Sequence, residues 1–434
     1  MCRCLPPKLG RTGTRTEFQP QQPSRQDFMN ETKGLSVAAA LMELVPPGVR
    51  QGAWATGSDA PEKTEVKVGF IPLTDCASVV IAAAKGFDRK YGIQLVPCKE
   101  PSWASVRDKT LSGVLDAAHV LYGLVLGVNL GIGGPKQDMA VLMTLNRNGQ
   151  GISLARHLLQ KGVKDGPSLA RLIKAEPREY TFAHTFPTGT HAMWLYYWLA
   201  SHGIDPLTEI RTITVAPPDM VENARIGNMD GFCVGEPWNA RGILDQVSFS
   251  VASSQDVWTD HPEKVLGTTA EFVRRHPNTT RAMMMAMLEA ARYIDDPGNR
   301  SEVARLIATE PYVNSPLGAI EGRFLGRYED GLGRQWDDPH ALRFYDDGKV
   351  PFPYLSDAMW FMTQHKRWGL LKAHPDYLAV ARQINQIELY RQAATQIRTP
   401  LPESDLRAST LMDGAVWDGG DPARYADSFS IQAT

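Results

Sequence analysis

The chain has 434 residues, a formal net charge of -2 at pH 7 and 43% hydrophobic residues. Such values are typical of a globular protein large enough for two compact lobes with their own cores. No lysine and arginine stripe and no basic patch interleaved with aromatic residues is present, so direct nucleic-acid binding is not expected. No run of about 18 uninterrupted apolar residues is present either, so membrane insertion is not expected.

Residues 1–30 are polar and rich in Arg, Gln and Pro, and we expect a disordered tail over residues 1–60. A signal peptide is the alternative, because an apolar run at 34–45 follows Lys33 and Ala53-Trp54-Ala55 resembles a cleavage site. Glu43 interrupts the run and two prolines separate it from that site. A cytoplasmic location is therefore favoured over export.

The five cysteines form an odd and scattered set. This pattern argues against a disulfide framework and favours a reducing compartment. Cys2 and Cys4 share the tail but have no matching second pair, so a zinc site is not expected there.

From Glu65 onward, predicted strands alternate with predicted helices. A strand at 66–73 ends at Thr74 and Asp75, which can cap a helix over 76–89. Further strands are predicted at 93–96, 115–118 and 139–145, with helices over 103–111 and from Val120. This rhythm predicts a parallel sheet with helices on both faces.

A second group of strands is predicted at 180–184, 211–215 and 230–234, and the strand at 247–252 is expected to return to the first sheet. Helices dominate from Thr268 onward. The chain is expected to end in a loose, polar tail over 401–434. The expected division is lobe I at 61–153 and 246–400, and lobe II at 154–245.

The stretch Thr185-Phe186-Pro187-Thr188-Gly189-Thr190-His191 joins a predicted strand to a predicted helix. Thr188 or Thr190 can cap this helix, with His191 in its first turn. The first backbone N–H groups of a helix lack internal partners and carry the positive end of the dipole, so they favour an anion. Ordinary capping without a ligand is the alternative.

Two lobes joined by two crossings place a cleft at the carboxyl ends of their strands. Polar and aromatic residues gather at these predicted ends: Asp75, Trp103, Gln150, Thr190, His191, Glu236 and Lys264. Taken singly, Lys264 would be interpreted as a solvated loop lysine, Gln150 as a surface amide and Trp103 as a core residue. Their joint position at strand ends favours a small polar ligand.

The strings GFIPLTDCA, PSWASVRDK, LNRNGQGIS, TFPTGTHAMW, DGFCVGEPWNA and DHPEKVLG resemble those of the nitrate/bicarbonate solute-binding proteins of ABC transporters. The resemblance runs from about Glu65 to about Leu371. Within the family, SWASVRDKTLSGVLDAAHVLYGLVLGV and FPYLSDAMWFMTQ resemble the branch of cytoplasmic nitrate/nitrite sensors such as NasS. The resemblance to the family implies an α/β fold of the periplasmic binding protein type II class, with two parallel-sheet lobes around a hinged cleft.

The resemblance also implies ligand contacts, at Trp103, Gln150, Gly151, His191 and Lys264, and Thr190 at the helix start is a further candidate. Nitrate is a flat monoanion, so it needs a face to stack on and in-plane donors, which an indole, a carboxamide and an imidazole supply. In the family, an acidic residue at the Lys264 position accompanies bicarbonate and a metal, whereas lysine accompanies nitrate or nitrite. No metal and no cofactor is expected.

For four other residues near these motifs, a role as a ligand contact is less strongly indicated. Glu236 and Trp238 open a predicted helix and are either structural or ligand contacts. His119 and Cys76 are expected in the core or the cleft wall.

The resemblance implies a cytoplasmic sensor that binds nitrate or nitrite and regulates nitrate assimilation. Its partner would be an ANTAR-type RNA-binding antiterminator (NasT-like), held by the open form and released on closure. The alternative is an exported solute-binding subunit of a nitrate/nitrite or bicarbonate ABC transporter. An enzyme is not expected, because no catalytic triad, partnered cysteine or metal spacing converges on the cleft.

Overall fold

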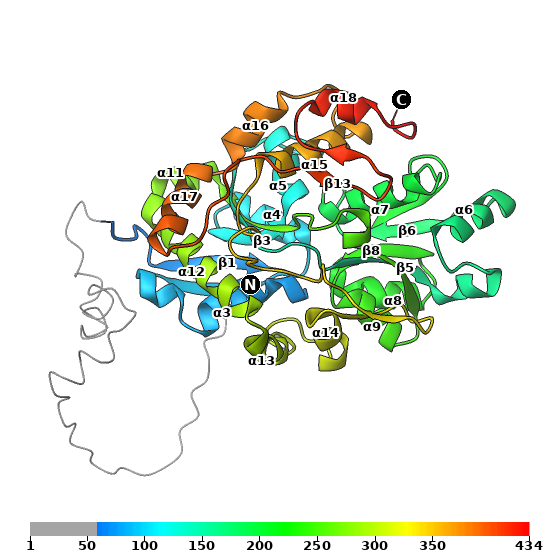
Figure 1. Ribbon diagram of the computed structural model, residues 1–434, viewed down its shortest axis with the longest axis horizontal. Helices are drawn as coiled ribbons and strands as arrows, with labels where there is room; N and C mark the ends of the chain where they lie inside the picture. Colours follow the sequence, from blue (N-terminus) through cyan, green and yellow to red (C-terminus); the bar gives the residue numbers. More distant parts are fainter. Residues whose placement is uncertain (1–58, 434) are drawn as a thin grey trace, which may run out of the picture. The chain divides into compact units, whose positions relative to one another are not determined.

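The computed structural model describes residues 59–433, whose framework is two five-stranded sheets surrounded by helices (Figure 1). Apart from positions 59 and 60, the tail predicted over 1–60 lies outside the described residues, as do Cys2, Cys4 and Ala53-Trp54-Ala55. No described helix is both long enough and apolar enough to cross a membrane.

The first sheet has the strand order β2-β1-β3-β10-β4. Its strands are β1 (Glu65–Phe70), β2 (Gln94–Lys99), β3 (Ala117–Leu121), β4 (Met139–Thr144) and β10 (Lys264–Thr269). β1 pairs in parallel with β2 and β3, whereas β10 is antiparallel to both β3 and β4. The two faces contact different cores: Ala117 packs in one apolar cluster and Ala118 in the other, as the alternation of side chains along a strand requires.

The second sheet has the strand order β7-β6-β8-β5-β9. Its strands are β5 (Gln150–Ala155), β6 (Thr181–His184), β7 (Arg211–Thr214), β8 (Gly231–Gly235) and β9 (Ser248–Ser253). β6 is parallel to β7 and β8, whereas β5 is antiparallel to β8 and β9. Both sheets are therefore mixed, which corrects the prediction of parallel sheets.

The strand predicted at 247–252 was also assigned to the wrong sheet. It forms β9 and pairs with β5 in the second sheet, and β10 is the strand that returns to the first. The first crossing lies before Gln150, where β5 begins, and not after residue 153. An apolar run predicts a strand but does not identify the strand with which it pairs, so its sheet could not be read from its composition.

Sixteen α-helices cover these sheets within residues 59–433. They are α3 (Ala77–Ala84), α4 (Trp103–Leu111), α5 (Tyr122–Leu130), α6 (Gly166–Ala175), α7 (Thr190–Ser201), α8 (Met220–Arg225), α9 (Trp238–Leu244), α10 (Ser254–Val257), α11 (Ala270–Arg275), α12 (Pro277–Asp295), α13 (Pro297–Ile307), α14 (Leu317–Phe324), α15 (Leu355–Arg367), α16 (Tyr377–Ile384), α17 (Ile387–Gln396) and α18 (Pro422–Asp427). The 3-10 turns are η2 (Thr74–Cys76), η3 (Asp88–Tyr91), η4 (Arg156–Lys161) and η5 (Pro217–Asp219). Two short hairpins are β11 (Arg327–Glu329) with β12 (Gln335–Asp337), and β13 (Ser409–Thr410) with β14 (Val416–Trp417).

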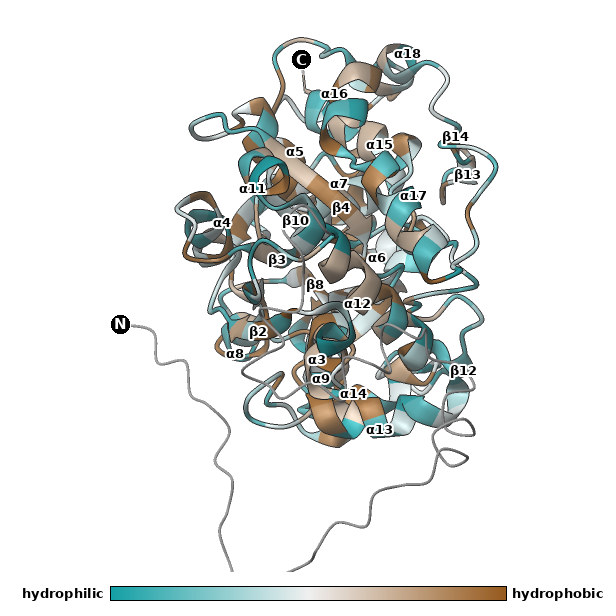
Figure 2. Ribbon diagram, turned by 90° about the vertical axis from the view of Figure 1, so that its left-hand side faces the viewer, coloured by the Kyte–Doolittle hydropathy of each residue, from teal (hydrophilic) through white to brown (hydrophobic). Residues whose placement is uncertain are grey.

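Two helices illustrate how the apolar pattern determines their position. α12 begins with Pro277 in its first turn, where the missing proline N–H costs nothing, and buries Met283, Met284 and Met287 against the first sheet's core. α5 consists almost entirely of apolar residues and is drawn mostly in brown in Figure 2, and eight of its nine residues are buried. A helix without a polar face belongs in the interior, and α5 lies there beside β3, β4 and α15.

The C-terminal stretch predicted as a loose tail is packed against the rest of the chain. Trp417 is 1% exposed and its Nε1 donates to the backbone O of Ser356 at 2.9 Å. Phe429 lies against Tyr197 of α7, with ring centroids 5.7 Å apart, and α18 packs on α15 (Figure 1). The polar average composition of 401–434 concealed a few large apolar anchors, which are enough to hold it.

Candidate anion-binding site

A cluster of buried polar side chains draws its members from both sheets. It consists of Asp75 in η2, His119 in β3, Gln150 at the start of β5, His191 in α7, Glu263 just before β10 and Lys264 at the start of β10. Asp75 is 1% exposed and the other five are fully buried. Because β3 and β10 belong to the first sheet and β5 to the second, the cluster lies where the two sheets meet.

Lys264 is the only ammonium in this cluster. Its Nζ lies 2.8 Å from Asp75 Oδ2 and 2.7 Å from Glu263 Oε1. Burial lowers the pKa of Lys264, but the two carboxylates raise it more, so its pKa is above the ordinary value. At Asp75 burial raises the pKa, and Lys264 followed by His119 lowers it further than burial raises it. Both groups are therefore ionised, and the alternative of a solvated loop lysine is wrong.

His191 and Gln150 are hydrogen-bonded to each other through His191 Nε2 and Gln150 Oε1. A carboxamide oxygen can only accept, so Nε2 carries the proton and donates. Gln150 Nε2 in turn donates to Asp75 Oδ2 at 3.3 Å. Burial and then the Lys264 charge lower the pKa of His191 well below its ordinary value, which makes the imidazole neutral.

Thr190 lies in the site but does not cap its helix. Gly189 is the N-cap of α7 and no side chain caps it, so the prediction of a threonine cap at 188 or 190 is wrong. Thr190 instead donates to Glu263 Oε1 at 2.6 Å. The turn before α7 is held against α5, where a Cβ on Gly123 would lie 2.3 Å from the backbone O of Thr188. That glycine is needed for the close approach that positions Thr190 and His191.

Gly151 lies inside the second sheet, in register with Val234 and Ser253 on either side. A Cβ at this position would lie 2.9 Å from the side chain of Asn239. The glycine is therefore required by packing within the sheet, next to Gln150.

Trp103 is the first residue of α4, after the N-cap Ser102, and is 1% exposed. Its ring lies 5.6 Å from Lys264 Nζ, measured to the centroid, and 6.3 Å from the ring of His119. Its Nε1 has no hydrogen-bond partner within residues 59–433. A buried donor without a partner costs about 1–3 kcal/mol, so this N–H is available to an acceptor that enters the cluster.

Sequence reasoning placed Asp75 among the polar residues at predicted strand ends, but it did not include Asp75, Glu263 or His119 among the ligand contacts. His119 was expected in the core or the cleft wall, and its Nε2 lies 2.9 Å from Asp75 Oδ1, a charge contact without hydrogen-bond alignment. Glu263 accepts from Thr190, from Lys264 and from Trp194 Nε1, the last at 3.1 Å. The position of Glu263 next to Lys264 in the sequence was the one available signal.

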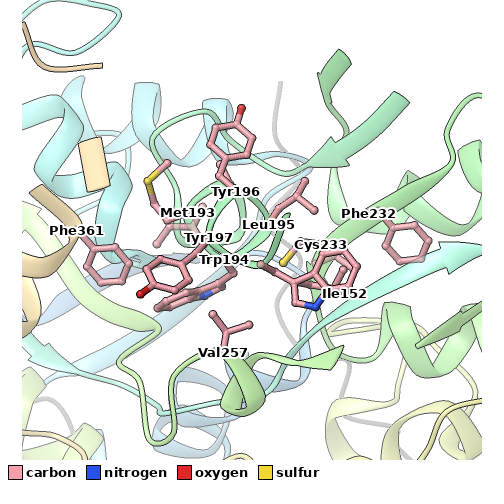
Figure 3. Packing of buried hydrophobic residues seen from close by; sticks show 14 of the residues in the cluster. Ile152, Met193, Trp194, Leu195, Tyr196, Tyr197, Phe232, Cys233, Val257 and Phe361 are labelled. Atoms are coloured by element: carbon pink, nitrogen blue, oxygen red, sulfur yellow. The ribbon is translucent and has the colours of Figure 1, made fainter. Parts of the chain in front are cut away.

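Aromatic rings form the wall behind Glu263. Trp194 lies 4.4 Å from the His261 ring and 5.1 Å from the Trp360 ring, measured between centroids. Figure 3 shows Trp194 among Tyr197, Val257 and Phe361. This packing fixes the indole whose N–H holds one Glu263 oxygen, so the carboxylate has little freedom to turn away from Lys264.

Glu236 and Trp238 link the chain segments beside the two sheets. Within residues 59–433, no hydrogen bond or ion pair joins either residue to Lys264. Trp238 Nε1 donates to the backbone O of Pro72 at 3.1 Å, and Thr74 N donates to the backbone O of Glu236 at 2.7 Å. The Glu236 carboxylate pairs with buried Arg323. Cys76 is in the core of the first sheet, where burial raises the pKa of its thiol.

An open pocket of about 430 Å³ between α14 and the β11–β12 hairpin shares no residue with the cluster. The cluster itself offers one ammonium, an unpartnered indole N–H, a carboxamide N–H and an imidazole N–H. These are donors for a small oxyanion, arranged around two carboxylates.

Comparison with known proteins identifies the family. Residues 59–308 match the NMT1-like family. The nitrate/nitrite binding protein NrtA of Synechocystis sp. is 36% identical over 391 residues, which cover 87% of each chain. The bicarbonate-binding protein CmpA of Synechococcus sp. is 28% identical over 450 residues, covering 96% of this chain and 99% of CmpA.

The fold is similar to that in a crystal structure of the periplasmic nitrate-binding protein NrtA from Synechocystis. The TM-score is 0.82 at 35% identity, and the match covers 86% of this chain and 100% of the other. The periplasmic binding protein fold expected from the motifs is confirmed, whereas a closer relation to the NasS-like sensors is not. The chain belongs to the NMT1-like family, among the solute-binding proteins of nitrate and bicarbonate ABC transporters.

Proposed function

We propose that this chain is the solute-binding protein of an ABC importer and that its ligand is nitrate or nitrite. The observation that carries the proposal is the buried cluster in which Gln150, His191 and Lys264 converge from both sheets beside the unpartnered N–H of Trp103. The resemblance to NrtA along most of both chains supports the same ligand class.

Each donor has a defined part in holding a flat monoanion. Lys264 has three N–H groups, two of which point to Asp75 and Glu263, so the third is left for the ligand. The Trp103 N–H gains its missing acceptor. His191 exchanges the hydrogen bond from its Nε2–H to Gln150 Oε1 for one to the anion. The donor of Gln150 is Nε2, which exchanges one of its long bonds, to Asp75 Oδ2 at 3.3 Å or to the backbone O of Asn148 at 3.4 Å, for a bond to the anion. Charge-assisted bonds of this kind contribute about 1.5–3 kcal/mol each.

The two sheets serve as the cores of two lobes in this proposal. The second lobe corresponds to β5 through β9, residues 150–253, which shifts the boundaries expected from the sequence. The chain then crosses between the lobes at 145–149 and 254–263. An anion that contacts side chains of both lobes favours the closed form, which is the form that a permease would recognise.

The choice between nitrate and bicarbonate depends on Lys264. Relatives of both kinds match this chain, and Lys264 is the ammonium that faces the ligand, with Asp75 and Glu263 as its present counter-ions. Lys264→Glu would leave three carboxylates together with no cation, and we expect it to abolish nitrate binding.

The transport role is proposed ahead of the sensor role because the related proteins are transport components. The location that goes with it is the periplasm. Release of an ANTAR-type antiterminator from a cytoplasmic form stays a prediction. Cell fractionation separates the two: recovery of the native chain in the cytoplasm would exclude the importer role, and a pull-down in which nitrate fails to release the antiterminator would exclude the sensor.

Calorimetric titration of the purified chain with nitrate, nitrite and bicarbonate tests the ligand directly. We expect binding of nitrate or nitrite, with loss of binding in Lys264→Glu and unchanged binding in Lys174→Glu, the same substitution at an exposed lysine of α6. Binding of bicarbonate alone, or nitrate affinity unchanged in Lys264→Glu, would refute the proposal.

A further inference from the structure

The cluster around Lys264 has no surplus of positive charge with which to receive an anion. Glu263 accepts three hydrogen bonds and donates none, as an ionised carboxylate does. Asp75 is held ionised by Lys264 and His119. One ammonium therefore faces two carboxylates, and even with His119 counted as a cation the cluster is only neutral. An added monoanion leaves at least one buried negative charge without a partner, which is costly.

His191 can accept a proton without moving. Its Nε2 already donates to Gln150 Oε1, and its Nδ1 faces the hydroxyl of Thr185. A hydroxyl can donate or accept, so it can turn to accept from a protonated Nδ1. Glu263 Oε1 lies 3.6 Å from His191 Nε2. An imidazolium at this position would have an acceptor at each nitrogen and a carboxylate beside it.

Other titratable groups lie near His191, but none has the same set of partners. Those that act on His191 directly are Asp75 from η2, His184 from β6, and His261, Glu263 and Lys264 at or before β10. His119 from β3 contacts Asp75, and Cys233 from β8 lies near Glu263 and Lys264. His119 Nδ1 and His184 Nδ1 have no hydrogen-bond partner within the described chain, so a proton placed there would be unpaired. His261 forms no ion pair among residues 59–433, and burial lowers its pKa to about 3.

We propose that the anion binds together with one proton, which His191 takes up at Nδ1. The inference rests on the proposed function, since it concerns the same site. The proton comes from solvent, the Thr185 hydroxyl turns from donating to accepting, and the anion replaces Gln150 Oε1 as the acceptor of the Nε2–H. No covalent bond of the anion changes, and the site gains one positive charge as it gains one negative charge.

The sign of the pH dependence follows from this exchange. The free protein holds His191 neutral and the complex holds it protonated, so the complex binds one more proton. Affinity therefore rises as pH falls, by at most about tenfold per pH unit, between the pKa of His191 in the free protein and its pKa in the complex.

Calorimetry of the full chain with sodium nitrate measures this linkage. Titrations at about pH 6, 7 and 8, each in phosphate and in Tris, should give a Kd that weakens toward alkaline pH by up to about tenfold per unit. The binding enthalpy should differ between the two buffers by the heat of up to one transferred proton. Nitrate binding with the same Kd at every pH and the same enthalpy in both buffers would overturn the inference and leave the proposed function standing.

Two variants distinguish proton uptake from a purely structural role. His191→Gln can still donate a hydrogen bond but cannot titrate, so its binding should be weaker and independent of pH. Glu263→Gln removes one negative charge, so it should bind nitrate more tightly than the native chain at about pH 8 and take up less proton. The control is His365→Gln: His365 is a buried histidine of α15 that donates to Thr188 O at 2.8 Å, and its removal should leave the pH slope intact.

The pH slopes of these variants decide whether His191 takes up the proton. A His191→Gln protein that keeps the native pH slope would show that the proton goes elsewhere and would overturn the inference. The same conclusion follows if Glu263→Gln leaves proton uptake unchanged. Failure of the native chain to bind nitrate at any pH would instead refute the proposed function.

Discussion

Two aspartates, Asp75 and Asp357, are equally hidden from solvent, yet their pKa values shift in opposite directions. Each is 1% exposed. At Asp75 burial raises the pKa, but Lys264 and His119 lower it more, and the net shift is downward. At Asp357 in α15 burial again raises the pKa, and Arg407 and Arg147 lower it by less, so the net shift is upward.

The difference lies in how many groups meet each carboxylate. Asp75 Oδ2 is 2.8 Å from Lys264 Nζ and accepts from Gln150 Nε2, while Oδ1 lies 2.9 Å from His119. Within residues 59–433, the Asp357 carboxylate accepts one hydrogen bond, from Arg407 Nε at 2.7 Å. A buried carboxylate does not by itself indicate a ligand site. The dense set of counter-groups that keeps Asp75 charged is the feature that distinguishes the candidate anion site from the Asp357–Arg407 ion pair.

The largest effect on stability should follow from removing the cation beside each aspartate, Lys264 at Asp75 and Arg407 at Asp357. Lys264→Gln leaves Asp75 and Glu263 buried without their ammonium, and breaking such a pair typically costs about 3–5 kcal/mol. We expect a loss of that size in the free energy of unfolding, measured by urea denaturation.

The matched change beside Asp357 is Arg407→Gln. Because burial already outweighs the arginines there, the carboxyl can take up a proton, and we expect a smaller loss of stability than in Lys264→Gln. Equal losses in the two variants would mean that the groups around the two aspartates do not differ in strength.

The order of elements was predictable from the sequence, whereas strand pairing was not. The apolar runs correctly placed β1, β4, β6 and β8, because alternating and continuous apolar stretches report burial directly. β5 is antiparallel to its neighbours in the second sheet, and β10 is antiparallel to its neighbours in the first. These pairings depend on which strands are neighbours in space, and no local sequence pattern contains that information. The packed C-terminal stretch was missed for a related reason, since Trp417 and Phe429 are isolated apolar residues in a polar context.

The site was partly predictable. Motif resemblance singled out Trp103, Gln150, His191 and Lys264, and the structure places the last three in one cluster with Trp103 beside it. The ion pairs of Lys264 with Asp75 and Glu263 were not foreseen, because the burial of Lys264 could not be read from its sequence context. Burying an ammonium alone is costly, so the structure pairs it with carboxylates.

The second prediction uses acid to separate the two aspartates. Asp75 has a lower pKa when folded than when unfolded, so its contribution to stability is present above its unfolded pKa and is lost as pH falls through its folded pKa. For a salt-bridged aspartate this is on the order of 2 kcal/mol. Asp357 has a higher pKa when folded, so protonation favours the fold and its contribution improves as pH falls through that raised pKa.

Urea denaturation of Asp75→Asn and Asp357→Asn between about pH 3 and about pH 6 measures how each aspartate changes the pH dependence of the free energy of unfolding. Relative to the native chain, Asp75→Asn should flatten the loss of stability in acid, and Asp357→Asn should steepen it. A steeper acid loss in Asp75→Asn would contradict the assignment of Asp75 as an ionised group held by Lys264 and His119.

The smallest effect should come from single indole N–H groups near the two aspartates. Trp103→Phe removes a donor that has no hydrogen-bond partner within residues 59–433, so relief of its burial cost should offset the packing lost with the smaller ring and leave stability nearly unchanged, while nitrate affinity falls by the value of one charge-assisted bond, about 1.5–3 kcal/mol. Trp417→Phe removes a donor that is bonded to Ser356 O next to Asp357, so stability should fall by about 1 kcal/mol with no change in nitrate affinity. Denaturation and calorimetry on both variants give the four values, and a Trp103→Phe protein that binds nitrate as well as the native chain would remove this indole from the site. Because both substitutions keep an aromatic ring, any difference between them reports what each N–H contacts rather than the volume that was lost.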